Sequence, residues 1–189
     1  MEIFTKTELR VRFDEIVENV RNGAIFIYPT DTIYGIGCNA LNKKSIQKIR
    51  DIKQRQTNPF SIWAPSLRWV KENFIMTSKA KKWLEELPGP YTLILQLQQS
   101  KLLPENVNPD TNDFVGVRIP DHWFGKIVEM LDVPIITTSV NKVGETFMTS
   151  LEDLEPDIQK EVEFIIYEGD KNGRPSKIVN VDKEDIRER

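Results

Sequence analysis

The sequence has very few cysteine and histidine residues. Its 189 residues include one cysteine, Cys38, and one histidine, His122. A single cysteine excludes an internal disulfide and is typical of a reducing compartment, so we expect a cytoplasmic protein with Cys38 as a small buried hydrophobic residue. A lone histidine without a recognisable carboxylate partner is a poor general base. We therefore expect His122 to lie in the first turn of a helix without a catalytic role.

The chain also lacks long apolar segments and the common phosphate-loop and nucleophile motifs. No apolar run reaches about 18 residues and no N-terminal signal pattern is present, so neither a membrane span nor secretion is predicted. There is no G-x-x-x-x-G-K-[ST] loop and no nucleophile elbow. The length and the 39% hydrophobic content predict one domain, residues 1–189, with a proper core.

Helix and strand patterns alternate along the chain without a linker or repeat. A capping box of Thr5 and Glu8 predicts a helix that ends at Asn22. Further helices are expected from near Asn42, Ser66, Ser78, Asp121 and Ser150, and strands at 24–28, 60–64, 91–97, 115–119, 135–138, 164–167 and 178–181. This alternation predicts an α/β single domain built on a twisted, mixed sheet with flanking helices.

The most informative segment is Tyr-Pro-Thr-Asp-Thr-Ile-Tyr-Gly-Ile-Gly, residues 28–37, directly after the apolar run 24–28. Pro29 ends the strand, and Gly35 and Gly37 permit tight turns or close ligand approach. Hydroxyl groups and the Asp31 carboxylate then gather at the strand end. The segment predicts a polar pocket, although such a composition is also common in ordinary turns.

A second segment is basic in a chain whose net charge is -3. The helix from Asn42 carries cations at 43, 44, 48 and 50, which we interpret as a solvated helix face. Lys53 and Arg55 differ, because the helix must end before Pro59 and the two cations are expected to project from a short rigid loop. Two fixed cations on a loop favour a polyphosphate ligand.

Five motifs together carry a family resemblance. They are the segment 28–37, Ile-Lys-Gln-Arg at 52–55 with Pro-Phe-Ser at 59–61, Pro-Gly-Pro-Tyr-Thr at 88–92, Val-Gly-Val-Arg-Ile-Pro at 115–120, and Thr-Ser-Val-Asn at 138–141. In this order and spacing, the chain from about residue 20 onward resembles the YrdC-like family, whose characterised members are L-threonylcarbamoyladenylate synthases. The resemblance implies an open α/β sheet that curves around a concave, positively charged cleft.

The resemblance also implies a reaction. L-threonine, bicarbonate or CO2, and ATP would give threonylcarbamoyl-AMP and pyrophosphate, and downstream transferase machinery would place the threonylcarbamoyl group on adenosine 37 of tRNA. ATP is then a substrate, Mg²⁺ accompanies it, and no metal is held by direct protein ligands. The chemistry requires positioning and charge neutralisation rather than a protein nucleophile, so no catalytic side chain is assigned.

Matching positions give a set of expected site residues. For threonine the resemblance implies Thr30, Arg118, Ser139 and Ser176, with Arg118 as a planar fork for the substrate carboxylate. For ATP it implies Lys53, Arg55, Asn141 and Arg187. The matched segments depart from the family pattern at Phe114, Val140, Lys177 and Asn180 and by a shorter loop after Arg55.

Two alternatives stay open at the level of sequence. The basic helix would suit a tRNA or double-stranded RNA contact, and the departures would suit a nucleotide-binding accessory protein without turnover. The acidic residues between 152 and 170 are interpreted as a solvated surface that repels nucleic acid. Residues 182–189 are expected to be disordered and dispensable as a free terminus, unless Arg187 folds over ATP as a lid.

Overall fold

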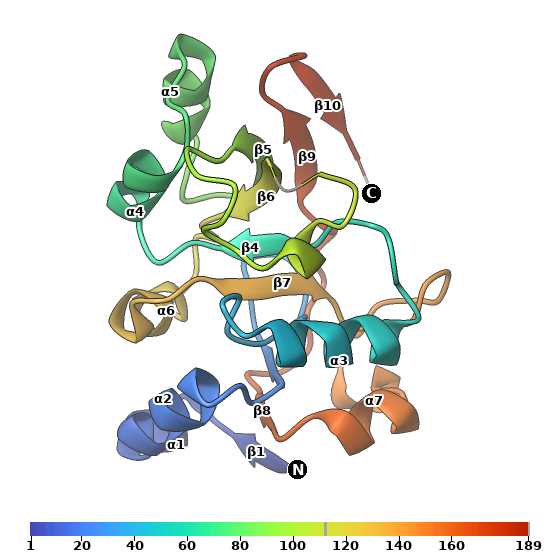
Figure 1. The fold of residues 1–189 in the computed structure, drawn as a ribbon. Helices are drawn as coiled ribbons and strands as arrows, with labels where there is room; N and C mark the ends of the chain where they lie inside the picture. Colours follow the sequence, from blue (N-terminus) through green and yellow to red (C-terminus); the bar gives the residue numbers. More distant parts are fainter. Residues whose placement is uncertain (112, 189) are drawn as a thin grey trace.

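A computed structural model describes residues 1–111 and 113–188 (Figure 1). These residues contain one ten-stranded sheet in the order β1-β8-β2-β3-β7-β4-β6-β5-β9-β10. The strands are β1 (Glu2–Phe4), β2 (Phe26–Tyr28), β3 (Gly35–Gly37), β4 (Ser61–Trp63), β5 (Tyr91–Gln96), β6 (Phe114–Arg118), β7 (Ile135–Ser139), β8 (Phe164–Ile166), β9 (Lys177–Asn180) and β10 (Asp185–Arg187). The chain therefore begins at one edge of the sheet and reaches the other edge at β10.

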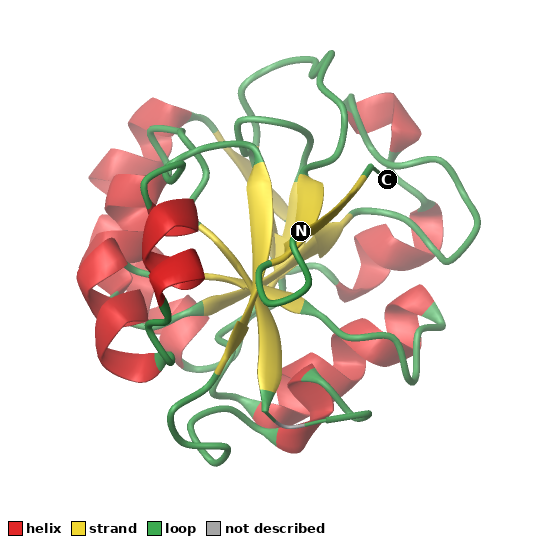
Figure 2. Cartoon of the chain, turned by 90° about the horizontal axis from the view of Figure 1, so that it is seen from above, coloured by secondary structure: helices red, strands yellow, loops and turns green. Residues whose placement is uncertain are grey.

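Parallel and antiparallel pairs are mixed throughout this sheet. β8 runs parallel to β1 and β2, β4 runs parallel to β6, and β5 runs parallel to β9, whereas β3, β7 and β10 pair antiparallel to their neighbours. Seen from above, the strands fan around one another inside a layer of helices (Figure 2). The expected single α/β domain with a twisted mixed sheet and flanking helices is confirmed.

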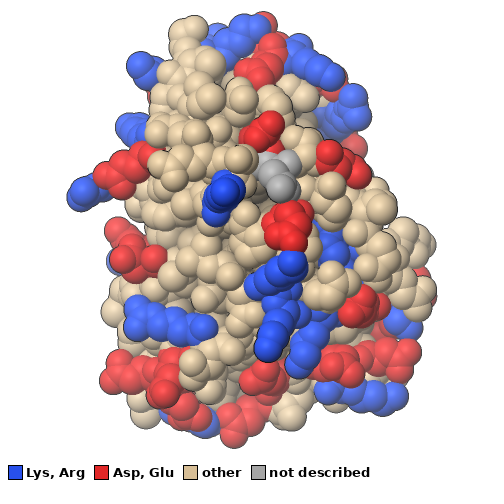
Figure 3. Space-filling view, in the orientation of Figure 1, with Lys and Arg blue, Asp and Glu red and all other residues tan. Residues whose placement is uncertain are grey.

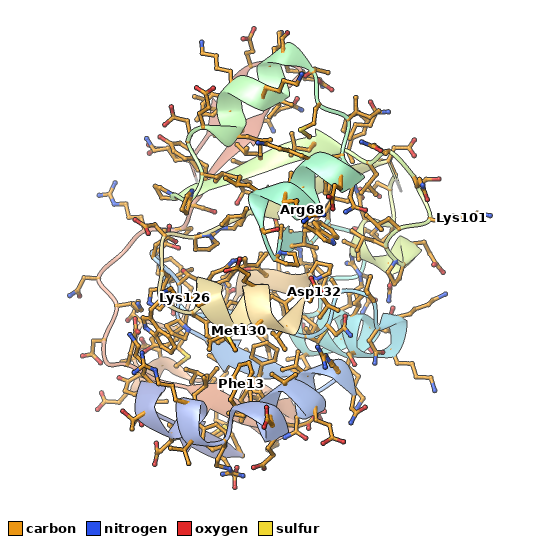
Figure 4. The ribbon with its side chains drawn as sticks, turned by 90° about the vertical axis from the view of Figure 1, so that its left-hand side faces the viewer. Phe13, Arg68, Lys101, Lys126, Met130 and Asp132 are labelled. Atoms are coloured by element: carbon orange, nitrogen blue, oxygen red, sulfur yellow. The ribbon has the colours of Figure 1, made fainter. Side chains whose placement is uncertain are left out.

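Helices flank the sheet on two sides. They are α1 (Lys6–Val11), α2 (Phe13–Arg21), α3 (Lys43–Lys53), α4 (Leu67–Asn73), α5 (Ser78–Leu84), α6 (Gly125–Leu131) and α7 (Pro156–Glu161), with 3-10 turns η1 (Glu105–Val107) and η2 (Leu151–Asp153). In Figure 1, α3 and α7 lie to the right and the other α-helices to the left. Figure 4 looks onto the left side, where the labelled Phe13 on α2 and Met130 on α6 lie in front of the sheet.

Strand alternation divides the buried side chains between two apolar clusters. Ile25 and Ile27 belong to the cluster beneath α3, α4, α5 and α7, whereas Phe26 and Tyr28 belong to the cluster beneath α1, α2 and α6. Successive side chains of a strand point to opposite faces, so both faces of β2 are buried. The expected burial of Cys38 is confirmed, with no measurable exposure of its side chain. Burial raises the pKa of its thiol, which keeps it unreactive.

Several expected helix boundaries are confirmed and others are wrong. Thr5 and Glu8 form the reciprocal capping box, and Ser66 caps α4. The expected helix from Thr5 to Asn22 is instead two helices that meet at Arg12, whose φ and ψ are -102° and 26°. The Arg12 guanidinium pairs with Glu2 of β1 and lies over the Phe4 ring, so contacts with the first strand favour the break.

Three helix starts lie a few residues from their expected positions. The cap of α5 is Thr77 rather than Ser78, because the Thr77 hydroxyl accepts from the amide of Ala80. α6 begins at Gly125 rather than near Asp121, since Asp121 has its amide bound by Asp31. Ser150 does cap a turn, but the turn is the 3-10 segment η2, and α7 follows from Pro156.

The C-terminal residues form a strand, so the expectation of a disordered tail is wrong for the described part of this segment. β10 pairs antiparallel with β9, with Ile186 opposite Val179. The preceding turn is held from outside the hairpin, because the Lys79 ammonium of α5 pairs with Glu184 and donates to the carbonyl of Asp182. Residue-by-residue polarity does not reveal such pairing, since an edge strand needs only one partner.

Charged residues of both signs are distributed over the surface. In the face that Figure 3 shows, Lys and Arg gather over α3. Lys43, Lys44 and Lys48 are exposed there as expected, and Lys43 pairs with Glu105. Within residues 1–111 and 113–188, no helix has the length and apolar character needed to cross a membrane.

Candidate active site

Two cavities adjoin at the ends of the central strands. The narrow pocket is lined by Thr30, Ile33, Tyr34, Gly35, Ser61, Thr92, Arg118, Thr137, Thr138, Ser139, Pro175 and Ser176. The wide cavity, of about 390 Å³, is lined by Arg55, Pro59, Phe60, Ser61, Thr92, Ile94, Gly116, Ile178, Asn180, Lys183, Asp185 and Arg187. Ser61 and Thr92 belong to both linings, so they form the wall between the two spaces.

The wide cavity lies on the face of β5 that α4 and α5 do not cover. On β5, Leu93 and Leu95 point into the apolar cluster beneath α4 and α5, while Thr92 and Ile94 line the cavity. Gly116 of β6 adds to this wall. A Cβ at Gly116 would lie 2.6 Å from the Ser61 hydroxyl, so a larger residue would displace the side chain that both cavities share.

Arg118 is the charged centre of the narrow pocket. Its side chain is 9% exposed and its Nη2 lies 3.0 Å from Oδ1 of Asp31, which is 11% exposed. The second Asp31 oxygen accepts from the amide of Asp121 at 3.1 Å. Burial lowers the pKa of Arg118 and the Asp31 charge opposes that shift. Nε of Arg118 is buried without a partner among the described residues, so a donor remains available in the pocket.

The hydroxyl groups of the pocket are already hydrogen bonded to one another. Thr30 donates to the carbonyl of Ile33 at 2.7 Å and its oxygen lies 3.0 Å from that of Thr32. Across the pocket, the hydroxyls of Thr92 and Ser176 are 2.7 Å apart and both residues are buried. The Thr30 oxygen also accepts from the amide of Thr32 at 3.1 Å, so its hydroxyl is both a donor and an acceptor within the 30–33 turn.

Lys53 does not project from a loop, so that expectation is wrong. It is the last residue of α3 and is 2% exposed. Its ammonium donates to the carbonyls of Ser139 and Asn141 at 2.5 and 2.6 Å and to the Asn141 side chain at 3.2 Å. The end of β7 supplies these acceptors. The structure thus joins the Lys53 motif to the Ser139–Asn141 motif, which lies 86 residues further along the chain at its first contact.

Arg55 is the first residue after the left-handed Gln54, and it does project from the loop as expected. Its guanidinium donates to the carbonyl of Pro59 at 2.6 Å and lies over the Phe60 ring at 5.2 Å. A longer contact of 3.4 Å reaches the Thr138 hydroxyl. Burial lowers the pKa of Arg55, and its Nε has no partner among the described residues.

Arg187 is brought to the same cavity by β10. It is exposed and its Nε donates to Asp185 at 2.7 Å. With Lys183 and Arg55, it gives the wide cavity three cations against one carboxylate in its lining. Of the four departures from the family pattern, only Asn180 belongs to either lining, whereas Val140 is buried in the core and Lys177 pairs with Glu188 on the surface.

His122 has a carboxylate partner, which the sequence did not reveal. Its Nε2 lies 2.9 Å from Oε1 of Glu168, and Trp123 donates to the other oxygen. Lys171 also pairs with Glu168 and donates to the carbonyl of Thr30. Burial lowers the pKa of His122, although Glu168 opposes this. Burial by itself would raise the pKa of Glu168, but the hydrogen bonds from Lys171, Trp123 and His122 keep that pKa below its ordinary range.

Glu168 and its hydrogen-bond partners hold the loop that follows β8 over the narrow pocket. The amide of Glu168 donates to the Tyr34 hydroxyl, which in turn donates to the carbonyl of Gly169. At Gly173, a Cβ would lie 2.1 Å from the carbonyl of Thr32, so the loop backbone passes directly over the 30–32 turn. Residues 175 and 176 at the end of this loop line the pocket.

Sequence reasoning missed Ser61, Thr92, Asp31 and Tyr34 as site residues. Ser61 and Thr92 had a signal, because each is a small polar residue inside an otherwise apolar strand pattern. Asp31 lay within the motif, but its role as the partner of Arg118 depends on a contact across 87 residues. Tyr34 reads as a core residue, and only the fold places its ring at the pocket.

Comparisons with known proteins identify relatives of this chain. A family profile of Sua5, YciO and YrdC, described as "Telomere recombination", matches residues 18–188. A Methanocaldococcus jannaschii protein provisionally named a threonylcarbamoyl-AMP synthase is 35% identical over 172 residues, which are 89% of this chain and 80% of that protein.

Two solved structures share the fold. Pyrococcus abyssi Sua5 in complex with L-threonine superposes with a TM-score of 0.83 at 26% identity, over 95% of this chain and 53% of that one. Escherichia coli YciO superposes with a TM-score of 0.82 at 23% identity, over 95% and 90%. The chain thus spans about half the length of the Pyrococcus protein and most of YciO.

Proposed function

This chain belongs to the Sua5/YciO/YrdC family, and we propose that it is a threonylcarbamoyl-AMP synthase, a nucleotidyltransferase that uses L-threonine, bicarbonate or CO2, and ATP. The observation that carries the proposal is the pair of adjoining cavities with a common wall at Ser61 and Thr92. One is small and has a single guanidinium, that of Arg118, in its lining. The other is larger and has three cations in its lining.

The narrow pocket suits an amino acid. Arg118 keeps a buried unpartnered Nε while Asp31 holds its Nη2, so the guanidinium is fixed and can still donate to the α-carboxylate of threonine. Ser139 and Ser176 offer hydroxyls on the walls, and Thr30 adds a third hydroxyl to the lining. Polar groups that converge on a small pocket are typical of small-molecule sites.

The wide cavity suits the nucleotide. Arg55 and Arg187 lie on its wall, where their guanidinium groups would bind phosphate oxygens. Lys53 and Asn141 belong to neither lining, and Lys53 would act next to the narrow pocket through its contact with Ser139. Because the Lys53 ammonium is surrounded by carbonyl oxygens, phosphate binding by this residue would require exchange of one such contact.

The arrangement supports a reaction at the common wall. Threonine carboxylated on its amine presents a carboxylate oxygen, which forms a bond to the α-phosphorus of ATP. The bond from that phosphorus to the bridging oxygen of the β-phosphate breaks, and pyrophosphate leaves with the electron pair. The protein holds two anions together and neutralises charge on the leaving group, so proximity and fixed cations supply the catalysis.

Mg²⁺ would enter with ATP. This ion is usually held by substrate phosphates and one or two carboxylates. The described residues contain no group of three or more His, Cys, Asp and Glu side chains able to hold a metal, but Asp185 supplies one carboxylate on the wall of the wide cavity. We place the reaction in the cytoplasm, with the product passed to transferase machinery that acts on tRNA adenosine 37.

The decisive experiment measures pyrophosphate release with ATP, bicarbonate and threonine, each omitted in turn. We expect release only when all three are present, together with a product of the mass of threonylcarbamoyl-AMP. Nucleotide binding without threonine-dependent release would instead favour an accessory protein. Salt-dependent RNA binding without ATP or threonine would favour the exposed lysines of α3 as an RNA contact.

A further inference from the structure

Arg50 is a buried cation that the proposed mechanism has not yet used. It was expected on the solvated face of α3, and that expectation is wrong, because the residue is 1% exposed. Its place on the helix explains this in part, since Ile46 and Ile49 beside it are also buried and α3 lies against the 105–107 turn. A long cationic side chain therefore enters the interior beneath the loop that follows α3.

The guanidinium of Arg50 is surrounded by backbone carbonyls. Nη1 donates to the carbonyls of residues 55, 56 and 58 at 2.8, 3.1 and 3.1 Å. Nε and Nη2 donate to the carbonyls of residues 106 and 107 at 2.7 and 3.2 Å. Three of these five acceptors belong to the loop that carries Arg55. The planar group also lies over the Phe60 ring at 4.4 Å, the same ring that Arg55 covers at 5.2 Å.

Backbone carbonyls leave the positive charge of Arg50 in place, whereas a carboxylate in an ion pair would cancel it. Among the described residues, no carboxylate lies within ion-pair distance of Arg50, so its charge is stabilised by carbonyl dipoles and is not cancelled. Burial and the neighbouring Arg55 lower the pKa of Arg50, while Asp110 opposes them. Arginine nevertheless stays protonated in proteins. The loop thus receives both a scaffold and a full positive charge from below.

We propose that Arg50 is a positioning residue for the nucleotide: by binding the carbonyls of the 55–58 loop from beneath, it fixes Arg55 at the wide cavity and adds its own charge to the phosphate site. Side chains of the loop at 56–59 are exposed. Gln56 is bonded to Asp51 and Gln47 on the surface of α3 and Arg55 donates to the carbonyl of Pro59, whereas Arg50 binds the loop carbonyls from beneath. Lysine cannot replace this anchor, because an ammonium offers three donors where the guanidinium offers five in a fixed plane. The inference rests on the proposed nucleotide site and deepens it.

The test uses the full chain with Arg50→Met, which keeps the length and apolar character of the stem, and with Arg50→Lys, which keeps the charge. Val128→Ala, in the cluster beneath α6, is the matched control for lost stability. Steady-state kinetics give the KM of ATP and of threonine separately. Calorimetry gives the Kd of ATP, and hydrogen exchange of the 56–58 amides reports on the loop.

We expect Arg50→Met to raise the KM and Kd of ATP by about tenfold with the KM of threonine within twofold of the wild type. Arg50→Lys should give a smaller change of the same kind. Hydrogen exchange at the 56–58 amides should become faster than in the wild type, by more than any change in β7. Val128→Ala should leave both KM values unchanged. Should Arg50→Met fail to fold, Arg50→Lys decides alone. A wild-type Kd for ATP in the folded arginine variants, or equal changes for both substrates, would overturn the inference.

The same measurements separate this inference from the proposed function. If the wild type binds ATP but releases no pyrophosphate with threonine and bicarbonate, the synthase proposal fails and Arg50 is judged by the ATP Kd. If the wild type releases pyrophosphate and Arg50→Lys keeps the wild-type Kd for ATP, only the positioning role fails. If the wild type neither binds ATP nor turns over, both fail.

Discussion

The narrow pocket and the wide cavity present their cations to an anionic ligand in opposite ways. In the narrow pocket Arg118 is buried and pre-paired with Asp31, and the hydroxyls of Thr92 and Ser176 are bonded to each other. In the wide cavity Arg187 is exposed and stands on an edge strand. A buried preformed network gives selectivity for one small ligand, because a misfit leaves polar groups unpaired. An open cationic wall tolerates a large ligand and adjusts to it.

The contrast predicts that polar substitutions cost stability in the narrow pocket and affinity in the wide cavity. Breaking one partner of a buried ion pair leaves an uncompensated charge, whereas exposed cations contribute little to folding. Arg55 lies between these extremes, because it is partly buried yet keeps a donor without a partner.

The largest effect is expected from Asp31→Asn. Loss of the carboxylate leaves Arg118 buried without a counter-charge, so the free energy of unfolding should fall by about 3 kcal/mol. The KM of threonine should rise more than that of ATP, since the guanidinium loses its fixed orientation. Urea unfolding and steady-state kinetics measure the two. Asp185→Asn, at the exposed wall, is the control, and a loss below about 1 kcal/mol for Asp31→Asn would remove the contrast.

The next effect is expected from Arg55→Ala. Removal of a charge-assisted phosphate contact should cost about 1.5 to 3 kcal/mol, which corresponds to about a 10- to 150-fold higher KM for ATP. The thermal midpoint should change little, and Lys48→Ala on the exposed face of α3 should change neither quantity. Wild-type turnover at low ATP in Arg55→Ala would remove this residue from the nucleotide site.

A smaller effect is expected from deletion of residues 183–189. Loss of β10 and of the Lys79–Glu184 pair should lower the ligand-free midpoint by about 3 °C, equivalent to about 1 kcal/mol. The ATP-dependent rise of the midpoint should also shrink. Arg187→Ala, which keeps the strand, should reduce only that rise. If the truncated protein shows the full rise with ATP, β10 is not part of the nucleotide site.

The smallest effect is expected from Glu168→Gln, which should lower the free energy of unfolding by about 1 kcal/mol or less at pH 7. The folded pKa of Glu168 lies below 4.5, so its stabilising contribution is present above pH 4.5 and is lost as the pH falls through the folded pKa. The lowered pKa of His122 acts in the same direction below pH 6.5, because the unfolded chain binds that proton more readily. The part of the difference between the thermal midpoints at pH 7 and pH 4 that Glu168 contributes should therefore be absent in the variant. An unchanged pH dependence would assign acid sensitivity elsewhere.

Local sequence determined much of the scaffold. Apolar runs located most of the strands, though not β3, and the capping residues Thr5 and Ser66 located two helix starts, because both signals act between neighbours in the chain. The family resemblance selected Arg118 and Ser176 as site residues, and the fold brings them to one pocket. Boundaries such as Arg12 depended on contacts with another element, and the pattern along the helix contains no record of them.

Only the tertiary structure decided the state of the long cations. Arg50 was expected on a solvated helix face and Lys53 on a loop, yet both are buried, because carbonyls at 106, 107, 139 and 141 accept their hydrogen bonds. The pairing of His122 with Glu168 and that of β10 with β9 were likewise decided by the tertiary structure. Polarity in a sequence states what a side chain needs. Whether solvent or a distant segment supplies the hydrogen-bond partners depends on the tertiary structure, because backbone acceptors have no sequence signature.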